Sequence, residues 1–527
     1  MSGLDAKLIV FEDEHLLVIN KPAGLNTHSP SLYAGEGIYE WLRNREPRWA
    51  TLAIVHRLDK ETSGLMVFGK TSIANKSLTD QFAKRQVTKK YLLETERSVK
   101  KREWVVRSRI GRAGDKYSSQ KPGRDALEAE TSFRVIGEES GITRVEANPA
   151  TGRTHQIRVH ASEGGFPIVG DKLYGGKPAA RLHLHAAQLI LKHPATKETL
   201  SFESPATFAA PAGEALRETL VAGAGTTAYR VIHGAADGWP GWYVDRLGDF
   251  VLSQGLESLS AEQKAFLERY ASRGVYHKVL TRDPRRGDAA DLNPVHVGGE
   301  LAVGPFNVLE NGMLFELSFE EGYSTGLFLD QRDNRRRFLV NHVAAGFPLL
   351  KEAAGAEVLN TFAYTCSFSV CAARAGARTT SIDLSRKYLE WGRRNFQLNK
   401  VDLAGHDFIY GDVFDWLRRF GKKNRLFDAI ILDPPTSSHS PEGFFTAEKH
   451  YGKLVTAALP VLKPGGVLLA STNAGRVEPE KFVGTVRSAV ASARRRVTAE
   501  HYVPQPPDFP ITRDEPGYLK TLWVRVE

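Results

Sequence analysis

The first residue along the chain that could act in catalysis is an aspartate that lies among basic residues. The segment HRLDKETSGLMVF at 56–68 places Asp59 shortly before the turn-forming TSG, and the apolar LMVF that follows is typical of a strand. Asp59 is therefore expected at the tip of a loop beside a strand. Taken alone, the tetrapeptide HRLD is better explained as a surface loop with an ordinary ion pair.

Two further segments carry polar residues that could work with such a carboxylate. KKYLLE at 89–94 presents Tyr91 at the start of a strand, where it could also be a core tyrosine. TGRTHQIRVH at 151–160 alternates basic and apolar residues, with Arg153 and Arg158 among them.

In this order, the segments resemble the RluA-type family of pseudouridine synthases. The resemblance covers nearly all of residues 8–204 and is carried by NKPAGL, HRLDKETSGL, KKY, GRTHQIRVH, GDKLYGG and RLHLHA. It implies an α+β catalytic domain over 1–204 that isomerises uridine to pseudouridine in RNA without a cofactor. No S4-type RNA-binding domain precedes the resemblance, so target choice is expected to rest on this domain or on the rest of the chain.

The resemblance also implies roles for three catalytic residues. The reaction breaks a glycosidic bond, turns the uracil and rejoins it through carbon, so it needs an anionic nucleophile, and Asp59 occupies that position. A closed pocket favours the protonated carboxyl group, while a nearby cation favours the charged one. Arg158 matches the family arginine that supplies this cation, and Tyr91 matches the tyrosine that packs on the target base and takes part in proton removal.

Charge along the chain agrees with an RNA substrate. Residues 51–200 hold 27 lysine and arginine residues against 16 aspartate and glutamate residues, whereas the rest of the chain is close to neutral. A local positive excess is suited to phosphate groups. A target uridine must be flipped out of its helix while basic side chains hold the backbone.

A second set of motifs lies in the C-terminal half. The strand-like VLN at 358–360 leads into FAYTCSFSVCAARAGA, a turn of small residues before a helix, which lets a cofactor approach backbone amides. Asp383 ends the next strand, where an acid commonly binds a ribose hydroxyl pair. Asp412 in GDVFDWL suits an adenine amine, and Asp433 in ILDPPT ends a further strand.

These motifs resemble class I S-adenosylmethionine-dependent methyltransferases, specifically ribosomal large-subunit RNA methyltransferases with a small α/β unit ahead of the catalytic sheet. The resemblance covers about 228–527 and implies that Phe362, Tyr364, Asp383 and Asp412 bind S-adenosyl-L-methionine. It also places STGLFLDQRDNRR at 324–336 near the methionine end of the cofactor, with Gln331 as a contact. The basic tail Arg335–Arg337 either belongs to that surface or is a solvated helix face.

Two departures bear on the methyl transfer. Relatives have glycine where this chain has Cys366, and a positive φ there would strain a cysteine. Relatives that methylate carbon 5 of cytosine use a cysteine after the strand equivalent to GGVLLAST, whereas Thr472 and Asn473 stand here. The DPPT segment is instead similar to that of relatives that methylate a guanine ring nitrogen, with Asp433 as a catalytic residue.

Length and composition set the domain organisation. A chain of 527 residues with 42% hydrophobic and 25% charged residues is a multidomain globular protein. The Ala-, Gly- and Pro-rich stretch 205–228 predicts a linker around a short helix, followed by a small α/β unit at 229–318. From 319 to 527, strands alternate with helices, as in a doubly wound α/β sheet.

Several classes of protein are excluded by the same sequence. There is neither a signal peptide nor a run of about 18 apolar residues, so no membrane association is expected. Cys366 and Cys371 are too few for a disulfide framework or a zinc site, which suggests the cytoplasm and no metal. The oligomeric state is left open.

Three hypotheses follow. The first is two catalysts acting on RNA, with large-subunit rRNA as the expected substrate and transfer RNA left open for the synthase half. The second is an active synthase with a non-catalytic, methyltransferase-like RNA-binding module. The third is a methyltransferase for small molecules or proteins fused to the synthase, which the small unit at 229–318 disfavours.

Overall fold

The computed structural model describes residues 5–121, 125–222, 225–270, 273–280, 293–321, 324–440 and 443–527. They form two compact units. The first comprises Met1–Ser29, Glu36–Trp41 and Thr51–Gly223, and the second comprises Pro30–Gly35, Leu42–Ala50 and Ala224–Glu527. No helix among the described residues has the length and apolar character needed to cross a membrane.

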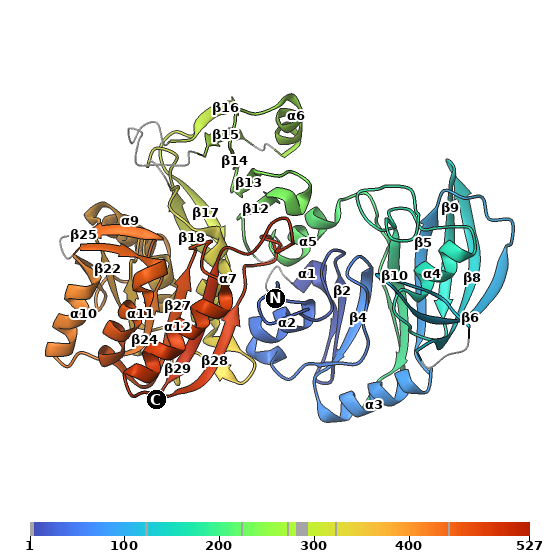
Figure 1. Ribbon diagram of the computed structural model, residues 1–527, viewed down its shortest axis with the longest axis horizontal. Coiled ribbons are helices and arrows are strands. Elements are labelled where there is room, and N and C mark those ends of the chain that lie inside the picture. Colours follow the sequence, from blue (N-terminus) through green and yellow to red (C-terminus); the bar gives the residue numbers. More distant parts are fainter. Residues whose placement is uncertain are drawn as a thin grey trace. The chain divides into compact units, whose positions relative to one another are not determined.

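The first unit is built on one large sheet (Figure 1), ordered β1-β2-β4-β10-β5-β9-β8-β6-β7, with β11 beside β10 and β3 beside β4. All pairs are antiparallel except β4 with β10. The strands are β1 Ile9–Glu12, β2 Leu16–Lys21, β3 Ala53–Ile54, β4 Ser63–Gly69, β5 Thr88–Thr95, β6 Glu103–Ala113, β7 Lys116–Ser119, β8 Leu127–Glu139, β9 Ile142–Pro149, β10 Leu184–Lys192 and β11 Thr199–Glu203. The helices along 1–223 are α1 Asp5–Leu8, α2 Ile38–Arg45, η1 Pro47–Trp49, α3 Ser72–Ala83, α4 Gln156–Glu163 and α5 Ala212–Leu220.

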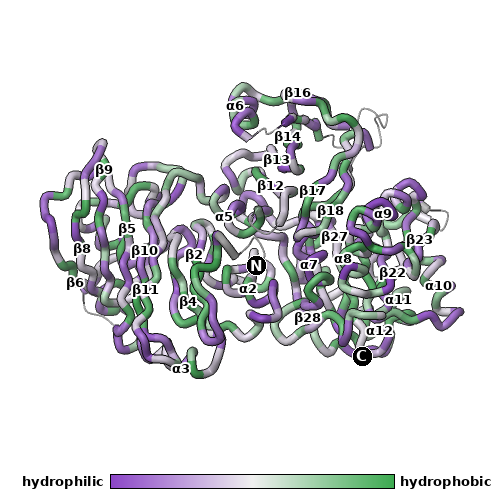
Figure 2. The backbone as a smooth tube through the Cα atoms, turned by 180° about the vertical axis from the view of Figure 1, so that it is seen from behind, coloured by the Kyte–Doolittle hydropathy of each residue, from purple (hydrophilic) through white to green (hydrophobic). Residues whose placement is uncertain are grey.

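Local sequence explains the entry into this sheet. The predicted pair of strands around an acidic turn is present as β1 and β2, because the Asp13 carboxylate accepts hydrogen bonds from the amides of His15 and Leu16. The apolar runs of β2 and β4 pair side by side and stand out in Figure 2. The α+β class predicted for this part is confirmed, and the short helix expected within 205–228 is α5; residues 223 and 224 lie outside the described part.

The second unit begins with a small sheet ordered β12-β13-β14-β15-β16. Its members are β12 Ala228–His233, β13 Trp242–Leu247, β14 Phe250–Gly255, β15 Gly274–Val279 and β16 Val295–Gly299, with η3 Gly234–Asp237 and α6 Ala261–Tyr270. The hairpin β17 Phe306–Glu310 and β18 Met313–Leu317 follows. Its turn is Asn311-Gly312, and both residues have positive φ, as a two-residue hairpin turn requires.

The larger sheet of this unit is ordered β23-β22-β21-β24-β27-β29-β28. The first five strands are parallel, and β29 runs antiparallel between β27 and β28. The strands are β21 Glu357–Thr361, β22 Arg378–Asp383, β23 Asp407–Tyr410, β24 Phe427–Leu432, β27 Leu462–Thr472, β28 Val497–Val503 and β29 Lys520–Val526. Short pairs are β19 His342–Ala344 with β20 Phe347–Pro348, and β25 Ser437–Ser440 with β26 Gly443–Thr446.

Helices cover both faces of this sheet. Those after Ala224 are η5 Leu329–Gln331, α7 Arg332–Val340, α8 Ser367–Arg374, α9 Arg386–Leu398, α10 Val413–Lys422, α11 Ala447–Ala458, η6 Leu459–Val461 and α12 Pro479–Ser492. Val358 of β21 packs in one core cluster with α7, α8 and α9, while the next residue, Leu359, packs in another with α10, α11 and α12. The predicted doubly wound α/β sheet is therefore confirmed, and its strands end at a common edge where ligands bind in such folds.

Candidate active sites

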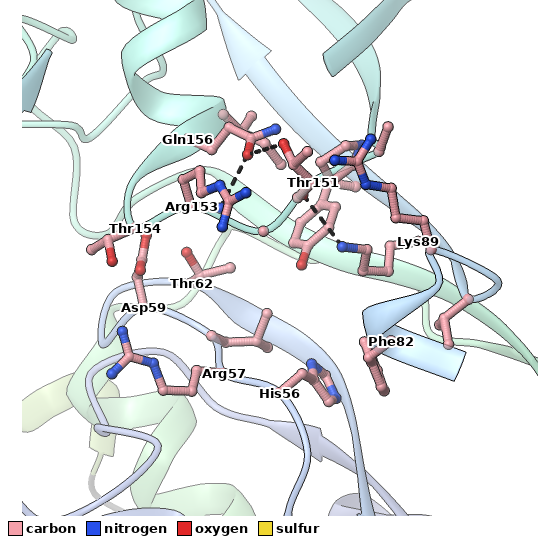
Figure 3. A pocket seen from close by; sticks show the side chains of 18 of the residues that line it. His56, Arg57, Asp59, Thr62, Phe82, Lys89, Thr151, Arg153, Thr154 and Gln156 are labelled. Carbon is pink, nitrogen blue, oxygen red and sulfur yellow. Dashed lines mark hydrogen bonds between the residues drawn. The ribbon is translucent and has the colours of Figure 1, made fainter. Parts of the chain in front are cut away.

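A cavity of about 490 Å³ opens in the first unit (Figure 3). Its lining comes from the loop before β4, the end of α3, β5, and the segment that joins β9 to α4. Asp59, Tyr91 and Arg158, far apart in sequence, all line it. The sequence motifs of this half thus converge on one pocket.

Asp59 lies in a loop whose backbone is tied on both sides. Leu58 exchanges hydrogen bonds with the Thr27 hydroxyl, and the carbonyl of Lys60 accepts from the Gly24 amide and the Lys21 ammonium. The Asp59 side chain remains one-quarter exposed toward the pocket. The fold therefore fixes the backbone of this loop and leaves the Asp59 carboxylate accessible from the pocket.

A glycine permits the close approach of two strands directly after this loop. Gly64 has φ +116°, and a Cβ there would lie 2.4 Å from the carbonyl oxygen of Ala186 on β10. Only glycine allows β4 to approach β10 in this way, and that parallel contact sets where the Asp59 loop ends.

Arg158 lies on α4 and faces three carboxylates. Its Nε and Nη2 donate to Asp171 at 2.7 and 2.8 Å, whereas Nη1 lies 4.0 Å from Asp59 and 3.5 Å from Glu61. From the sequence, Arg158 was predicted to pair with the nucleophile. Arg158 is within ion-pair reach of Asp59, but its short hydrogen bonds go to Asp171.

Burial governs the acidity of the two reactive groups. It raises the pKa of Asp59, and the positive charges of His155 and Arg158 offset this only in part. Burial, together with the charge of Asp59, also raises the pKa of Tyr91 well above its ordinary value. The Tyr91 phenol on β5 therefore stays protonated at neutral pH.

Basic side chains line the pocket around these groups. Arg57 and Arg85 are exposed, Lys89 donates to the carbonyl of Thr151, and Arg153 to that of Glu128. Such side chains can hold phosphate groups while a base enters the pocket. Lys89 was not among the site residues predicted from the sequence, although it lies two residues before Tyr91.

His56, also in the pocket wall, has a structural explanation. Its Nε2 accepts the Val67 amide at 3.0 Å, and its ring stacks on Phe82 with centroids 4.7 Å apart. Burial lowers the pKa of His56 to about 3, so the imidazole is neutral. Groups of three or more His, Cys, Asp or Glu side chains that could hold a metal do not occur among the described residues.

The second candidate site lies at the carboxyl ends of β21, β22 and β24. Phe362, Tyr364 and Cys366 all adopt left-handed backbone conformations, with φ of 54°, 48° and 59°. Alternating conformations of this kind turn backbone N–H groups toward one side, which suits a polar ligand. The helix expected after this turn is α8.

Asp383 supports this turn, whereas Asp412 stabilises the start of a helix. Asp383 accepts hydrogen bonds from the amides of Tyr364 and Ser385, both at 2.8 Å, and burial raises its pKa. Asp412 caps α10 by accepting from the amides of Phe414 and Asp415. Each carboxylate keeps further lone pairs for a ligand.

Asp433 follows β24 directly and is held by Gln331. The Gln331 amide nitrogen donates to Asp433 at 3.0 Å and to Ser471 at 2.8 Å, while its oxygen accepts from Asn334. Gln331 was expected to contact the cofactor, but its side-chain amide is hydrogen-bonded to Asp433. Burial and the nearby charge of Asp330 raise the pKa of Asp433 to about 7.

Cys366 is fully buried, and its positive φ meets the condition for strain stated above. Its sulfur packs against α9, since a Cβ on Gly392 would meet it at 2.4 Å. Burial raises the pKa of Cys366 to about 12, and that of buried Cys371 also rises. These are the only cysteines in the sequence, so neither supplies a thiolate at neutral pH.

The basic tail of the 324–336 block differs from both expectations. Arg335 forms a buried pair with Glu310 at 2.6 and 2.7 Å, and Arg337 donates to the carbonyls of Val343 and Asp333. Arg335 and Arg337 therefore face neither a ligand nor solvent. A distant carboxylate, 25 residues earlier, compensates the burial of the Arg335 charge.

Comparison with known families gives two matches along the chain. The RNA pseudouridylate synthase model matches residues 15–163, and the S-adenosylmethionine-dependent methyltransferase model matches residues 253–525.

Individual relatives agree with the second match. Ribosomal RNA large subunit methyltransferase I of Aeromonas salmonicida is 30% identical over 393 residues, 73% of this chain and 93% of the relative. Ribosomal RNA large subunit methyltransferase of Deinococcus radiodurans is 35% identical over 321 residues, 59% of this chain and 76% of the relative. The crystal structure of SMU.776, a methyltransferase complexed with SAH, superposes with a TM-score of 0.52 at 27% identity, over 64% of this chain and 87% of that one.

Proposed function

Because this chain belongs to the S-adenosylmethionine-dependent methyltransferase family and also carries an RNA pseudouridylate synthase domain, we propose that it introduces both a pseudouridine and a methylated base into large-subunit ribosomal RNA. The names of its relatives support this choice of RNA. The observation that carries the proposal is the convergence of Asp59, Tyr91 and Arg158 in one basic pocket. The cytoplasm, where ribosomal RNA is modified in bacteria, is the proposed location.

In the synthase pocket, Asp59 acts as the nucleophile on the target uridine. Arg158 lies 4.0 Å away and favours its charged form, against the effect of burial. Tyr91 packs against the base, and its protonated phenol can donate a hydrogen bond. The basic side chains around the cavity hold the flanking phosphates.

In the methyltransferase unit, the residues fit S-adenosyl-L-methionine. The left-handed turn at Phe362–Cys366 offers backbone N–H groups, Asp383 a ribose partner and Asp412 an amine partner. The cofactor supplies an activated methyl group. Asp433 orients the target base or accepts its proton, and Gln331 positions Asp433.

The deciding experiment is nucleotide-resolution mapping of pseudouridine and methylated bases in ribosomal and transfer RNA from cells with and without this gene. Loss of one pseudouridine and one methyl group from large-subunit rRNA is expected. A missing modification in transfer RNA alone would contradict the proposed substrate.

Replacing Asp383 by alanine should weaken S-adenosylmethionine binding by about 1–3 kcal/mol, because the hydrogen-bonding groups it satisfies are stranded in a polar pocket. Isothermal titration calorimetry measures this directly. Asp415→Ala, which removes a carboxylate paired with Arg418 and Arg419 on the surface of α10, is the matched control and should leave the Kd unchanged. An unchanged Kd for Asp383→Ala would place the ribose partner elsewhere.

The same titration separates a second candidate function, in which the methyltransferase unit only binds RNA. The left-handed Cys366 favours this alternative, since strain in the turn could weaken cofactor binding. The retained Asp383, Asp412 and Asp433 argue against it. Absence of any binding heat with the unaltered chain would favour the non-catalytic module.

A further inference from the structure

The GDKLYGG motif lies in the loop after α4, and the roles of Asp59, Tyr91 and Arg158 leave it unexplained. Within it, Asp171 is almost completely buried, with 1% of its surface exposed. A buried carboxylate needs a partner of opposite charge, because its desolvation is costly. Here that partner is Arg158.

The contact between Asp171 and Arg158 fixes the guanidinium plane. Nε donates to one carboxylate oxygen at 2.7 Å and Nη2 to the other at 2.8 Å, a two-point pairing that allows little rotation. Only Nη1 is left to face the pocket, where it lies 4.0 Å from Asp59 and 3.5 Å from Glu61. The direction in which Arg158 presents its free nitrogen thus depends on Asp171.

The loop is built to hold this carboxylate. The Tyr174 amide donates to Asp171 Oδ1 at 3.3 Å, and the Tyr174 ring covers the Arg158 guanidinium with 5.1 Å between carbon and centroid. Gly170 has φ +80°, and a Cβ there would lie 1.8 Å from the carbonyl oxygen of Arg181. The glycine, the aspartate and the tyrosine of the motif therefore all help to hold the Arg158 guanidinium in place.

We propose that Asp171 is a positioning residue for pseudouridine formation, which holds Arg158 so that its Nη1 faces the nucleophile Asp59. This inference rests on the proposed synthase function. Asp171 acts through Arg158 and also balances much of its charge. An arginine without this partner would approach Asp59 or Glu61 freely and would lose the geometry that the reaction needs.

A double-mutant cycle tests the proposal, using single-turnover pseudouridine formation on an unmodified large-subunit rRNA transcript. Asp171→Asn should lower the rate by about 10–100-fold, the scale seen when a supporting partner of a functional group is removed. The half-saturating RNA concentration should change by less than about twofold, because Arg158 acts after the base has entered. Asp115→Asn, the same change at an exposed turn, is the control.

The second side of the cycle uses Arg158→Gln. If Asp171 acts only through Arg158, adding Asp171→Asn to Arg158→Gln should cost less than about threefold, because the interaction is already lost. The double variant also removes both members of the buried pair, so it avoids an unpaired charge and keeps the test valid if Asp171→Asn alone fails to fold.

The pH profile gives a readout that a general loss of structure would not move. The titratable or charged groups around Asp59 are Lys21, Glu61, Tyr91, His155 and Arg158. Asp171→Asn removes a negative charge behind Arg158, so the Asp59 carboxyl should ionise at lower pH, and the acidic limb of the rate profile should move down. A variant that is merely misfolded loses rate at every pH alike.

Three results would overturn the inference. They are a rate for Asp171→Asn within threefold of the unaltered chain, an equal loss from Asp171→Asn with and without Arg158, or an acidic limb that stays in place. The proposed synthase function fails separately, if Asp59→Asn remains active.

Discussion

Asp59→Asn should abolish pseudouridine formation, lowering the rate by at least about a thousandfold, as expected when a nucleophile is removed. Asparagine keeps the size and polarity of the side chain, and the backbone of this loop is tied through Leu58 and Lys60. RNA binding should therefore stay nearly unchanged. Pseudouridine in the transcript is measured by mass spectrometry, and RNA affinity by a filter-binding titration.

Two comparisons make this result specific. Asp80→Asn, the same change on the exposed face of α3, should leave pseudouridine formation intact. Methylation by Asp59→Asn should equal that of the unaltered chain, because its cofactor edge is built entirely from the other unit. Residual pseudouridine formation within tenfold of normal would remove Asp59 from the role of nucleophile.

Local pattern was sufficient for much of the fold. The strands that carry Tyr91 and Asp383, and the turn at Cys366, follow from apolar runs and from turn-forming residues near them. The mainly parallel sheet of the second unit follows from the alternation of strands and helices after residue 319. The two family resemblances added the identity of the candidate site residues. The strands and turns were thus predicted from neighbouring residues, and the site residues from resemblances that span whole domains.

The partners of charged residues could not be predicted in this way. The pairing of Arg158 with Asp171, and of Arg335 with Glu310, joins separate elements, and only the folded chain shows that each charge is buried and balanced. A run of arginines on a helix indicates a solvated face by composition alone. Gln331 illustrates the same limit, since its contact with Asp433 spans 102 positions.

The methyl group is expected on a ring nitrogen of guanine, and not on carbon 5 of a pyrimidine. Carbon 5 becomes nucleophilic only after a thiolate adds to the neighbouring ring carbon, so that product requires a reactive cysteine. At the end of β27 stand Thr472 and Asn473, where the resemblance leads us to expect the cysteine of the relatives that methylate carbon 5. The Asn473 side chain accepts a hydrogen bond from Thr436. Cys366 is buried with a pKa of about 12 and packs on α9.

Asp433 is the group that should control this transfer. Asp433→Asn should lower the methylation rate by about 10²–10⁴-fold, the usual contribution of a positioned acid or base, while the Kd for S-adenosylmethionine changes little. Because burial and Asp330 raise the pKa of Asp433 to about 7, with Arg335 opposing them, its carboxylate form increases as pH rises. The methylation rate should therefore rise through pH 7 and fall below it.

Mass spectrometry of RNA treated with the purified protein and labelled cofactor identifies the methylated atom. Label in a methylguanine, retained by Cys366→Ala and lost in Asp433→Asn, is the expected pattern, because the lone pair of a ring nitrogen attacks the methyl group without covalent help once it is held in place. Label in 5-methylcytosine or 5-methyluridine that disappears with Cys366→Ala would reverse the assignment. The buried sulfur would then have to leave its contact with α9 and act as the nucleophile.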